Sequence, residues 1–197
     1  MIGLALLVAV YASVSDPLRI GPRWLVPALM LGIMFALVLA LRAGRHPEAR
    51  WLTLVMTGVA TLAVEGSMAG LVSRLIDGNV YAPYLLRDAA LLWIVNVLVF
   101  ALWYWELDGG GPRTRHSQGY VPTDLAFPQI ALGRKYSSNW TPRFIDYLFV
   151  AFTASAAFSP TDTSILSVRA KLLLMIQAIG SIVILAIVAA RAINILS

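Results

Sequence analysis

Long apolar runs are the feature that most constrains how this 197-residue chain can fold. A helix needs about 20 predominantly apolar residues to cross the hydrocarbon core of a bilayer, whereas a membrane β-strand needs about half as many. Runs near the helical length recur along the sequence, separated by polar loops rich in Pro, Gly and Arg. Because lipid offers no partner to the backbone, such runs must form helices. We therefore predict an all-α integral membrane protein.

Five runs are predicted to cross the membrane, of which the first is short and starts at the N-terminus. They cover Met1–Val14, Trp24–Leu41, Trp51–Val72, Ala89–Trp105 and Leu172–Ala190, with the helix of the last run extending from near Ile165 to near Ile195. These runs divide the chain into an N-terminal four-helix membrane region (1–106), a polar loop (107–143) and a C-terminal hairpin (144–197). Within the polar loop, the glycine-rich stretch Gly109–Gly119 is expected to be mobile.

Composition supports the membrane assignment and excludes several classes of function. Apolar residues make up 59% of the chain and charged residues 13%, against about 45–50% and about 25% in soluble domains. The chain has no cysteine, and its two histidines lie in polar stretches, so we expect no metal site and no cofactor. The net charge of +5 comes from basic residues between the apolar runs. These residues fit a lipid bilayer as partner better than nucleic acid.

The segment Phe144–Phe158 is apolar but only 15 residues long. As a helix it would extend roughly 22 Å, which is too short for a hydrocarbon core of about 30 Å. Thr141 can cap this helix and Pro142 suits its first position. The polar stretch Ser159–Ser164 follows and breaks the helix at Pro160. The pattern predicts a re-entrant half-helix, whose negative C-terminal end favours a cation inside the membrane.

Residues Phe144–Leu196 resemble the pore domain of the potassium-channel superfamily, with an aromatic pore helix, a threonine-led filter and a long inner helix. Thr153 stands where the filter threonines of that family begin, and Ala157-Phe158-Ser159 stands roughly at its Gly-Tyr-Gly. Asp162 lies a few residues beyond the aspartate of that motif, and Gly180 takes the place of a hinge glycine. The whole chain also resembles a family of prokaryotic multi-pass membrane proteins with an FSPTDT motif. The resemblance implies a pore-like homo-oligomer in the plasma (inner) membrane of a prokaryote.

The segment departs from the potassium-channel pattern in its glycines. Filter glycines allow the backbone angles that aim carbonyl groups at the ion, but this chain has no glycine between Gly133 and Gly180. Ala157 and Ser159 would be strained in that geometry. We therefore expect weak selectivity among monovalent cations rather than a potassium filter.

Oxygen-bearing side chains gather in the same stretch and are suited to hard cations. The candidate ion-path residues are Thr153, Ser155, Ala157, Phe158, Ser159, Thr161 and Asp162.

Three polar residues lie inside the predicted spans: Glu65, Asn96 and Gln177. A charged side chain at the centre of a bilayer costs about 2.5–3.5 kcal/mol or more. Two interpretations stay open. The three residues form one polar cluster lining an ion or proton path, or a protonated Glu65 bonds an amide and packs the helices. Arg169 and Lys171, just before the last span, are expected to reach lipid headgroups.

Three classes of function compete. The first is a channel-like, weakly selective pore for monovalent cations. The second is a non-conducting membrane scaffold or partner subunit that uses the same fold. The third is an enzyme acting on lipid, which would need acid, base or metal-ligating residues clustered at a membrane edge. The sequence contains no such cluster, so enzymatic activity is not expected.

The charge distribution predicts the orientation in the membrane. With five spans, the loops on one side carry ten of the 15 lysines and arginines, including those of the 107–143 loop. The positive-inside rule places that side, and the N-terminus, in the cytoplasm. Single cysteines introduced between Gly109 and Gly119 should then resist membrane-impermeant maleimide in intact cells and react once the cells are opened. Labelling of these cysteines in intact cells would contradict this prediction and indicate the opposite orientation.

Overall fold

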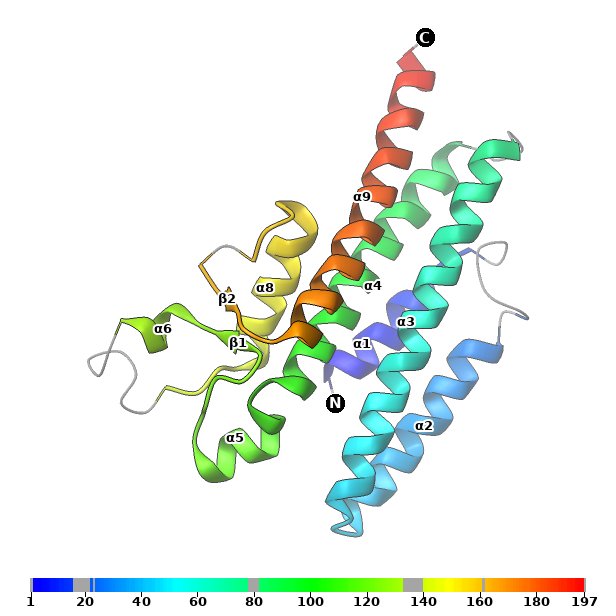
Figure 1. The fold of residues 1–197 in the computed structure, drawn as a ribbon. Helices are drawn as coiled ribbons and strands as arrows, with labels where there is room; N and C mark the ends of the chain where they lie inside the picture. The colour runs from blue at the N-terminus through cyan, green and yellow to red at the C-terminus, as the bar shows by residue number, and fades with distance from the viewer. Residues whose placement is uncertain are drawn as a thin grey trace. The chain divides into compact units, whose positions relative to one another are not determined.

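The computed structural model of the chain describes residues 2–15, 22, 24–77, 82–132, 140–160 and 162–196, and these residues are mostly helical (Figure 1). The long helices are α1 (Ile2–Tyr11), α2 (Leu25–Arg42), α3 (His46–Asp77), α4 (Ala82–Leu107) and α9 (Val168–Leu196). Shorter elements are the 3-10 turn η2 (Asp108–Gly110), α5 (Pro112–Gln118), α6 (Pro128–Ala131) and α8 (Phe144–Ala156). Two short strands, β1 (Leu125–Ala126) and β2 (Ser164–Ile165), complete the elements.

Four helices in the described part of the chain are long and apolar enough to cross a membrane. They belong to α2, α3, the segment that begins in α4, and α9. They match four of the five predicted spans. The first predicted span forms α1, which has ten residues and a length of about 15 Å.

The residues fall into two compact units, and α4 and α9 each contribute to both. Unit 1 contains residues 1–99 and 180–197, and unit 2 contains residues 100–179.

Unit 1 is built around the pairing of α2 with α3. A tight turn joins these helices, in which Gly44 has a φ of +69° and lets the chain reverse directly after α2. Tyr11 of α1 is buried, and its hydroxyl lies 3.4 Å from the Ser67 hydroxyl of α3. Met68 of α3 packs against Gly180 of α9, where a Cβ atom would lie 3.2 Å from the Met68 sulfur.

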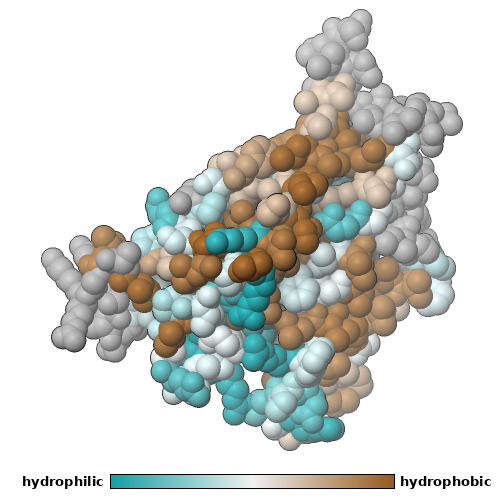
Figure 2. All heavy atoms as spheres, viewed as in Figure 1, coloured by the Kyte–Doolittle hydropathy of each residue, from teal (hydrophilic) through white to brown (hydrophobic). Residues whose placement is uncertain are grey.

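Large apolar side chains remain exposed on the helices of unit 1. Phe35 of α2 is 66% exposed and Leu62 of α3 is 73% exposed. Figure 2 shows apolar residues over much of the visible face. Exposure on this scale suits a lipid environment, because a soluble domain rarely leaves large apolar patches in water.

Unit 2 contains the glycine-rich stretch Gly109–Gly119, which forms a turn and a short helix. Gly109, Gly110 and Gly111 all have positive φ values, between 56° and 94°, and form an ordered turn that leads into α5. Glycine adopts these angles without the clash that a Cβ atom would cause. These glycines therefore build a specific turn rather than a featureless linker, and the mobility of the stretch stays a prediction.

The chain also contains a small departure from an all-α fold. β1 and β2 pair antiparallel, with Leu125 opposite Ile165 and Ala126 opposite Ser164. This pairing explains why α9 begins at Val168 rather than near Ile165, since Ile165 is held in a strand.

Candidate functional site

The short helix α8 begins through a contact of Asp146 with the backbone. The N–H of Arg143 donates to Asp146 Oδ2 at 2.6 Å, so the carboxylate satisfies a free donor at the helix N-terminus. The helix cap is therefore Arg143, and the prediction that Thr141 and Pro142 start the helix was wrong. With 13 residues, α8 extends about 20 Å.

One face of α8 packs inside unit 2 and the other is exposed. Tyr147, Ala151 and Ala154 are fully buried, whereas Phe149 and Phe152 are about half exposed. The exposed face is apolar, which suits lipid or another protein better than water.

Gln177 of α9 holds the inner part of α8. Its Nε2 donates to the Ala151 carbonyl at 2.6 Å and to Ser155 Oγ at 2.8 Å. Its Oε1 accepts from the Tyr104 hydroxyl of α4 at 2.7 Å. A single buried amide therefore joins α4, α8 and α9.

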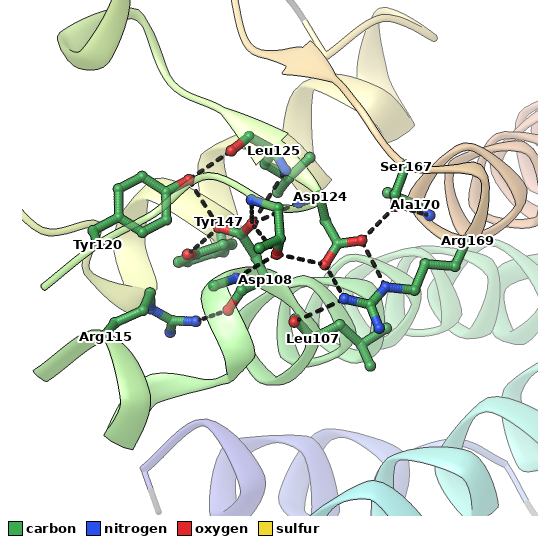
Figure 3. Close-up of polar contacts among 12 residues, drawn as sticks. Leu107, Asp108, Arg115, Tyr120, Asp124, Leu125, Tyr147, Ser167, Arg169 and Ala170 are labelled. Carbon is green, nitrogen blue, oxygen red and sulfur yellow. Dashed lines mark hydrogen bonds and ion pairs between the residues drawn. The ribbon is translucent and has the colours of Figure 1, made fainter. Parts of the chain in front are cut away.

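Asp108 holds the other end of α8 (Figure 3). This carboxylate is fully buried and directly follows α4. Its Oδ2 accepts from the Tyr147 hydroxyl of α8 at 2.7 Å and from the Tyr120 hydroxyl at 2.9 Å. Its Oδ1 accepts from the N–H groups of Asp124 and Leu125 at 3.0 and 3.2 Å. Hydrogen bonds to an ionised acceptor are stronger than neutral ones.

Asp124 joins the start of α9 to the same cluster. Arg169 donates from Nε and Nη2 to the two Asp124 oxygens, at 2.6 and 2.5 Å, and Ser167 Oγ donates to Oδ1. Burial by itself would raise the pKa of Asp124, but the hydrogen bonds from Arg169 and Ser167 hold that pKa below its usual range. Asp124 is therefore ionised at neutral pH. The expectation that Arg169 only reaches lipid headgroups was wrong, because this carboxylate offers it a paired partner.

Arg115 of α5 completes the group, which we call the Asp108 cluster. The Arg115 side chain is almost fully buried, and its guanidinium carbon lies 4.5 Å from the Trp105 ring centre and 5.0 Å from that of Tyr147. Its Nη1 donates to the Asp108 carbonyl. The six members of the cluster are Asp108, Arg115, Tyr120, Asp124, Tyr147 and Arg169.

The Asp108 cluster fixes the directions of α8 and α9 within unit 2. The first turns of both helices attach to the end of α4, where Tyr147 binds Asp108 and Arg169 binds the carbonyl of Leu107. Farther along, Ala151 and Ser155 of α8 meet Gln177 of α9. The two helices therefore run the same way from the cluster, and the chain between Ala156 and Val168 returns to it.

The seven candidate ion-path residues fall into different environments. Thr153 and Ser155 are buried in α8, where the Thr153 hydroxyl donates to carbonyl groups of its own helix. Four others lie exposed in the returning segment: Ala157, Phe158, Ser159 and Asp162. Thr161 lies outside the described residues.

Phe158 carries the backbone strain of the returning segment. Its φ is +53°, and no other described residue apart from glycines has a positive φ. Ala157, by contrast, has a φ of −112°. A left-handed angle in a residue with a side chain costs roughly 1–2 kcal/mol, and such residues cluster at functional sites.

The three polar residues within the spans have different surroundings. The Asn96 amide donates to Ser181 Oγ at 3.0 Å within unit 1, while Gln177 bonds Tyr104 and α8 within unit 2. Glu65 Oε1 is buried beside Gly180 and makes no hydrogen bond. This oxygen therefore does not form the hydrogen bond to a side-chain amide that the helix-packing interpretation expects. Gly180 lies within the continuous helix α9, and its role as a hinge stays a prediction.

The Asp108 cluster was missed at the sequence level. A local signal exists at Asp108 itself, since an acidic residue followed by three glycines directly after a long apolar run indicates a structured helix end. Nothing local pairs Asp108 with Tyr147, which lies 39 residues away. No group of three or more acidic or histidine side chains that could hold a metal occurs in the described part of the chain.

Comparison of the chain with protein-family models, with curated proteins and with solved structures gave no significant match.

The Asp108 cluster predicts a large effect of an isosteric substitution. Asp108→Asn removes the charge and turns an NH₂ group toward donors, so buried hydroxyl or N–H groups lose their acceptor. We expect the free energy of unfolding to fall by about 3 kcal/mol, read as a lower midpoint of thermal unfolding by tryptophan fluorescence in detergent. Asp162→Asn removes an exposed carboxylate in the same unit and should leave the midpoint unchanged. Equal midpoints for both variants would contradict the role of Asp108.

Proposed function

We propose that this protein is a channel-like membrane protein whose copies assemble around a weakly selective path for monovalent cations. The observation that carries the proposal is the common origin of α8 and α9 at the Asp108 cluster. A helix that enters beside the start of the next span, and is too short to cross, fits a re-entrant half-helix. In this proposal α1 is the short first of five spans, and the protein resides in the plasma membrane of a prokaryote.

The end of α8 supports the proposal electrostatically. The last four carbonyl groups of a helix have no partner within it, and the C-terminal end carries a partial negative charge. The exposed Ser159 and Asp162 follow three and six residues after this end. Backbone oxygens, a hydroxyl and a carboxylate together suit a hard cation.

Assembly of several copies is part of the proposal, because the returning segment of one chain is exposed rather than enclosed. The apolar face of α8, with Ile145 at 62%, Phe149 at 55% and Phe152 at 48% exposure, supplies a surface that a neighbouring copy can cover. The left-handed Phe158 lies between Ala157 and Ser159, the two positions that stand roughly at the filter glycines of the potassium-channel pattern. Its strain is the kind that a functional segment retains.

A non-conducting scaffold is the second candidate, and it also rests on an observation. The hydroxyl of Thr153 bonds its own helix, and Ser155 is bonded by Gln177. Two of the four hydroxyl groups among the candidate ion-path residues are thus engaged in packing. A partner subunit that only braces its neighbours would need no more than this.

Flux measurements separate the two candidates. We expect purified protein in liposomes to pass Na⁺ and K⁺ at similar rates above empty liposomes, and Asp162→Asn to change this flux at least several-fold. The matched control is Glu48→Gln, which removes an exposed carboxylate at the start of α3 and should leave the flux unchanged. Absence of wild-type flux over several voltages and pH values would exclude the pore and favour the scaffold.

A further inference from the structure

Glu65 is the only charged side chain within the five apolar runs of the sequence. It lies in α3, far from the polar ends of that helix. Arg50 precedes it by 15 residues, or about 22 Å along a helix. Glu65 therefore sits at a depth where water does not routinely hydrate a carboxylate.

The immediate surroundings of Glu65 are apolar and close. Its Oε1 is buried and unbonded, and a Cβ atom on Gly180 would lie 3.6 Å from it. The sulfur of Met68, one turn along α3, lies against the same position of Gly180. The small residue at position 180 lets α9 approach this oxygen.

The neighbouring polar groups are engaged elsewhere. Ser181 accepts from Asn96, and Ser67 lies at hydrogen-bond distance from Tyr11.

Charged residues on the helices of unit 1 lie near the helix ends, and none whose side chain the structure describes forms an ion pair with Glu65. Arg45 pairs with Glu48, and Asp88 accepts from the Ser15 N–H. Arg87 donates to the Ser13 carbonyl. The remaining basic residues of these helices also lie at or near their ends: Arg42, Arg50, Arg74 and Arg191.

We propose that Glu65 is a proton-binding site within the membrane, protonated at neutral pH, at the contact between α3 and α9. An ionised carboxylate here would have little water and no ion pair among the side chains that the structure describes, at a cost of about 2.5–3.5 kcal/mol or more. Protonation removes the charge and most of that cost. The proposal concerns unit 1 and is independent of whether the protein conducts cations.

A protonated carboxyl group in an apolar setting has a distinctive reactivity with hydrophobic carbodiimides. The acid O–H adds across one C=N bond of the carbodiimide, with the proton going to nitrogen and the carboxylate oxygen to carbon. The acyl group then migrates from oxygen to nitrogen and gives a stable N-acylurea. The adduct contains every atom of both reactants, so no oxidant, leaving group or further reagent is involved.

The experiment uses the full chain in lipid vesicles treated with dicyclohexylcarbodiimide, followed by digestion and mass spectrometry. We expect one carbodiimide mass on Glu65, at a rate that falls as the pH rises, and no adduct at position 65 in Glu65→Gln. Glu48 is the internal control, because its exposed side chain pairs with Arg45 and should stay unmodified. Modification of Glu48 with none on Glu65, or a rate that does not fall with rising pH, would overturn the proposal.

Infrared spectroscopy measures the protonation state of Glu65 directly and does not depend on how fast the carbodiimide reacts. A protonated carboxyl group has a carbonyl stretch distinct from that of an ionised carboxylate. We expect this band in the wild type at neutral pH and its loss in Glu65→Gln, with the folded helix content unchanged. If the wild type lacks the band, Glu65 is ionised and the proposal is wrong. Glu65→Gln is expected to fold, since the amide matches the neutral acid in size and charge.

Discussion

The buried carboxylate of Asp108 is the contact on which the arrangement of unit 2 depends. A buried charge is tolerated only when hydrogen bonds replace the water it has lost. Asp108 gathers its replacements from α8, from Tyr120 and from the backbone at the start of β1. Since these donors come from distant parts of the sequence, satisfying one carboxylate fixes where each of them lies.

From this constraint follows the course of the chain between α8 and α9. The backbone N–H of Asp124 donates to the Asp108 carboxylate, and the side chain of Asp124 binds Arg169 at the start of α9. Gln177 acts in the same way inside the unit, because its one side-chain amide forms hydrogen bonds with Tyr104, Ala151 and Ser155. The Asp108 cluster and the Gln177 hydrogen bonds thus hold α8 and α9 at two points along their lengths. Together they place the two helices side by side and running in the same direction.

The sequence predicts what depends on local pattern. The four long spans and the short α8 follow from the lengths of the apolar runs. The Asp108 cluster does not, because a tyrosine such as Tyr147 in an apolar run looks like any interfacial aromatic. Arg169 was likewise assigned to lipid headgroups, since its partner Asp124 lies 45 residues earlier. Composition alone also does not distinguish a glycine linker from the specific turn that the positive φ values of the glycines at 109–111 build.

The central claim is that α8 enters and leaves the membrane on the same side. The chain has no cysteine, so single cysteines can be placed at the exposed positions Arg143 and Val168, just before α8 and at the start of α9. A third cysteine at the exposed Ser73, near the end of α3, reports the opposite side. In sealed vesicles of one orientation, impermeant maleimide should label positions 143 and 168 alike and position 73 oppositely. Labelling of positions 143 and 168 from opposite sides would show that α8 crosses the membrane and would contradict the account.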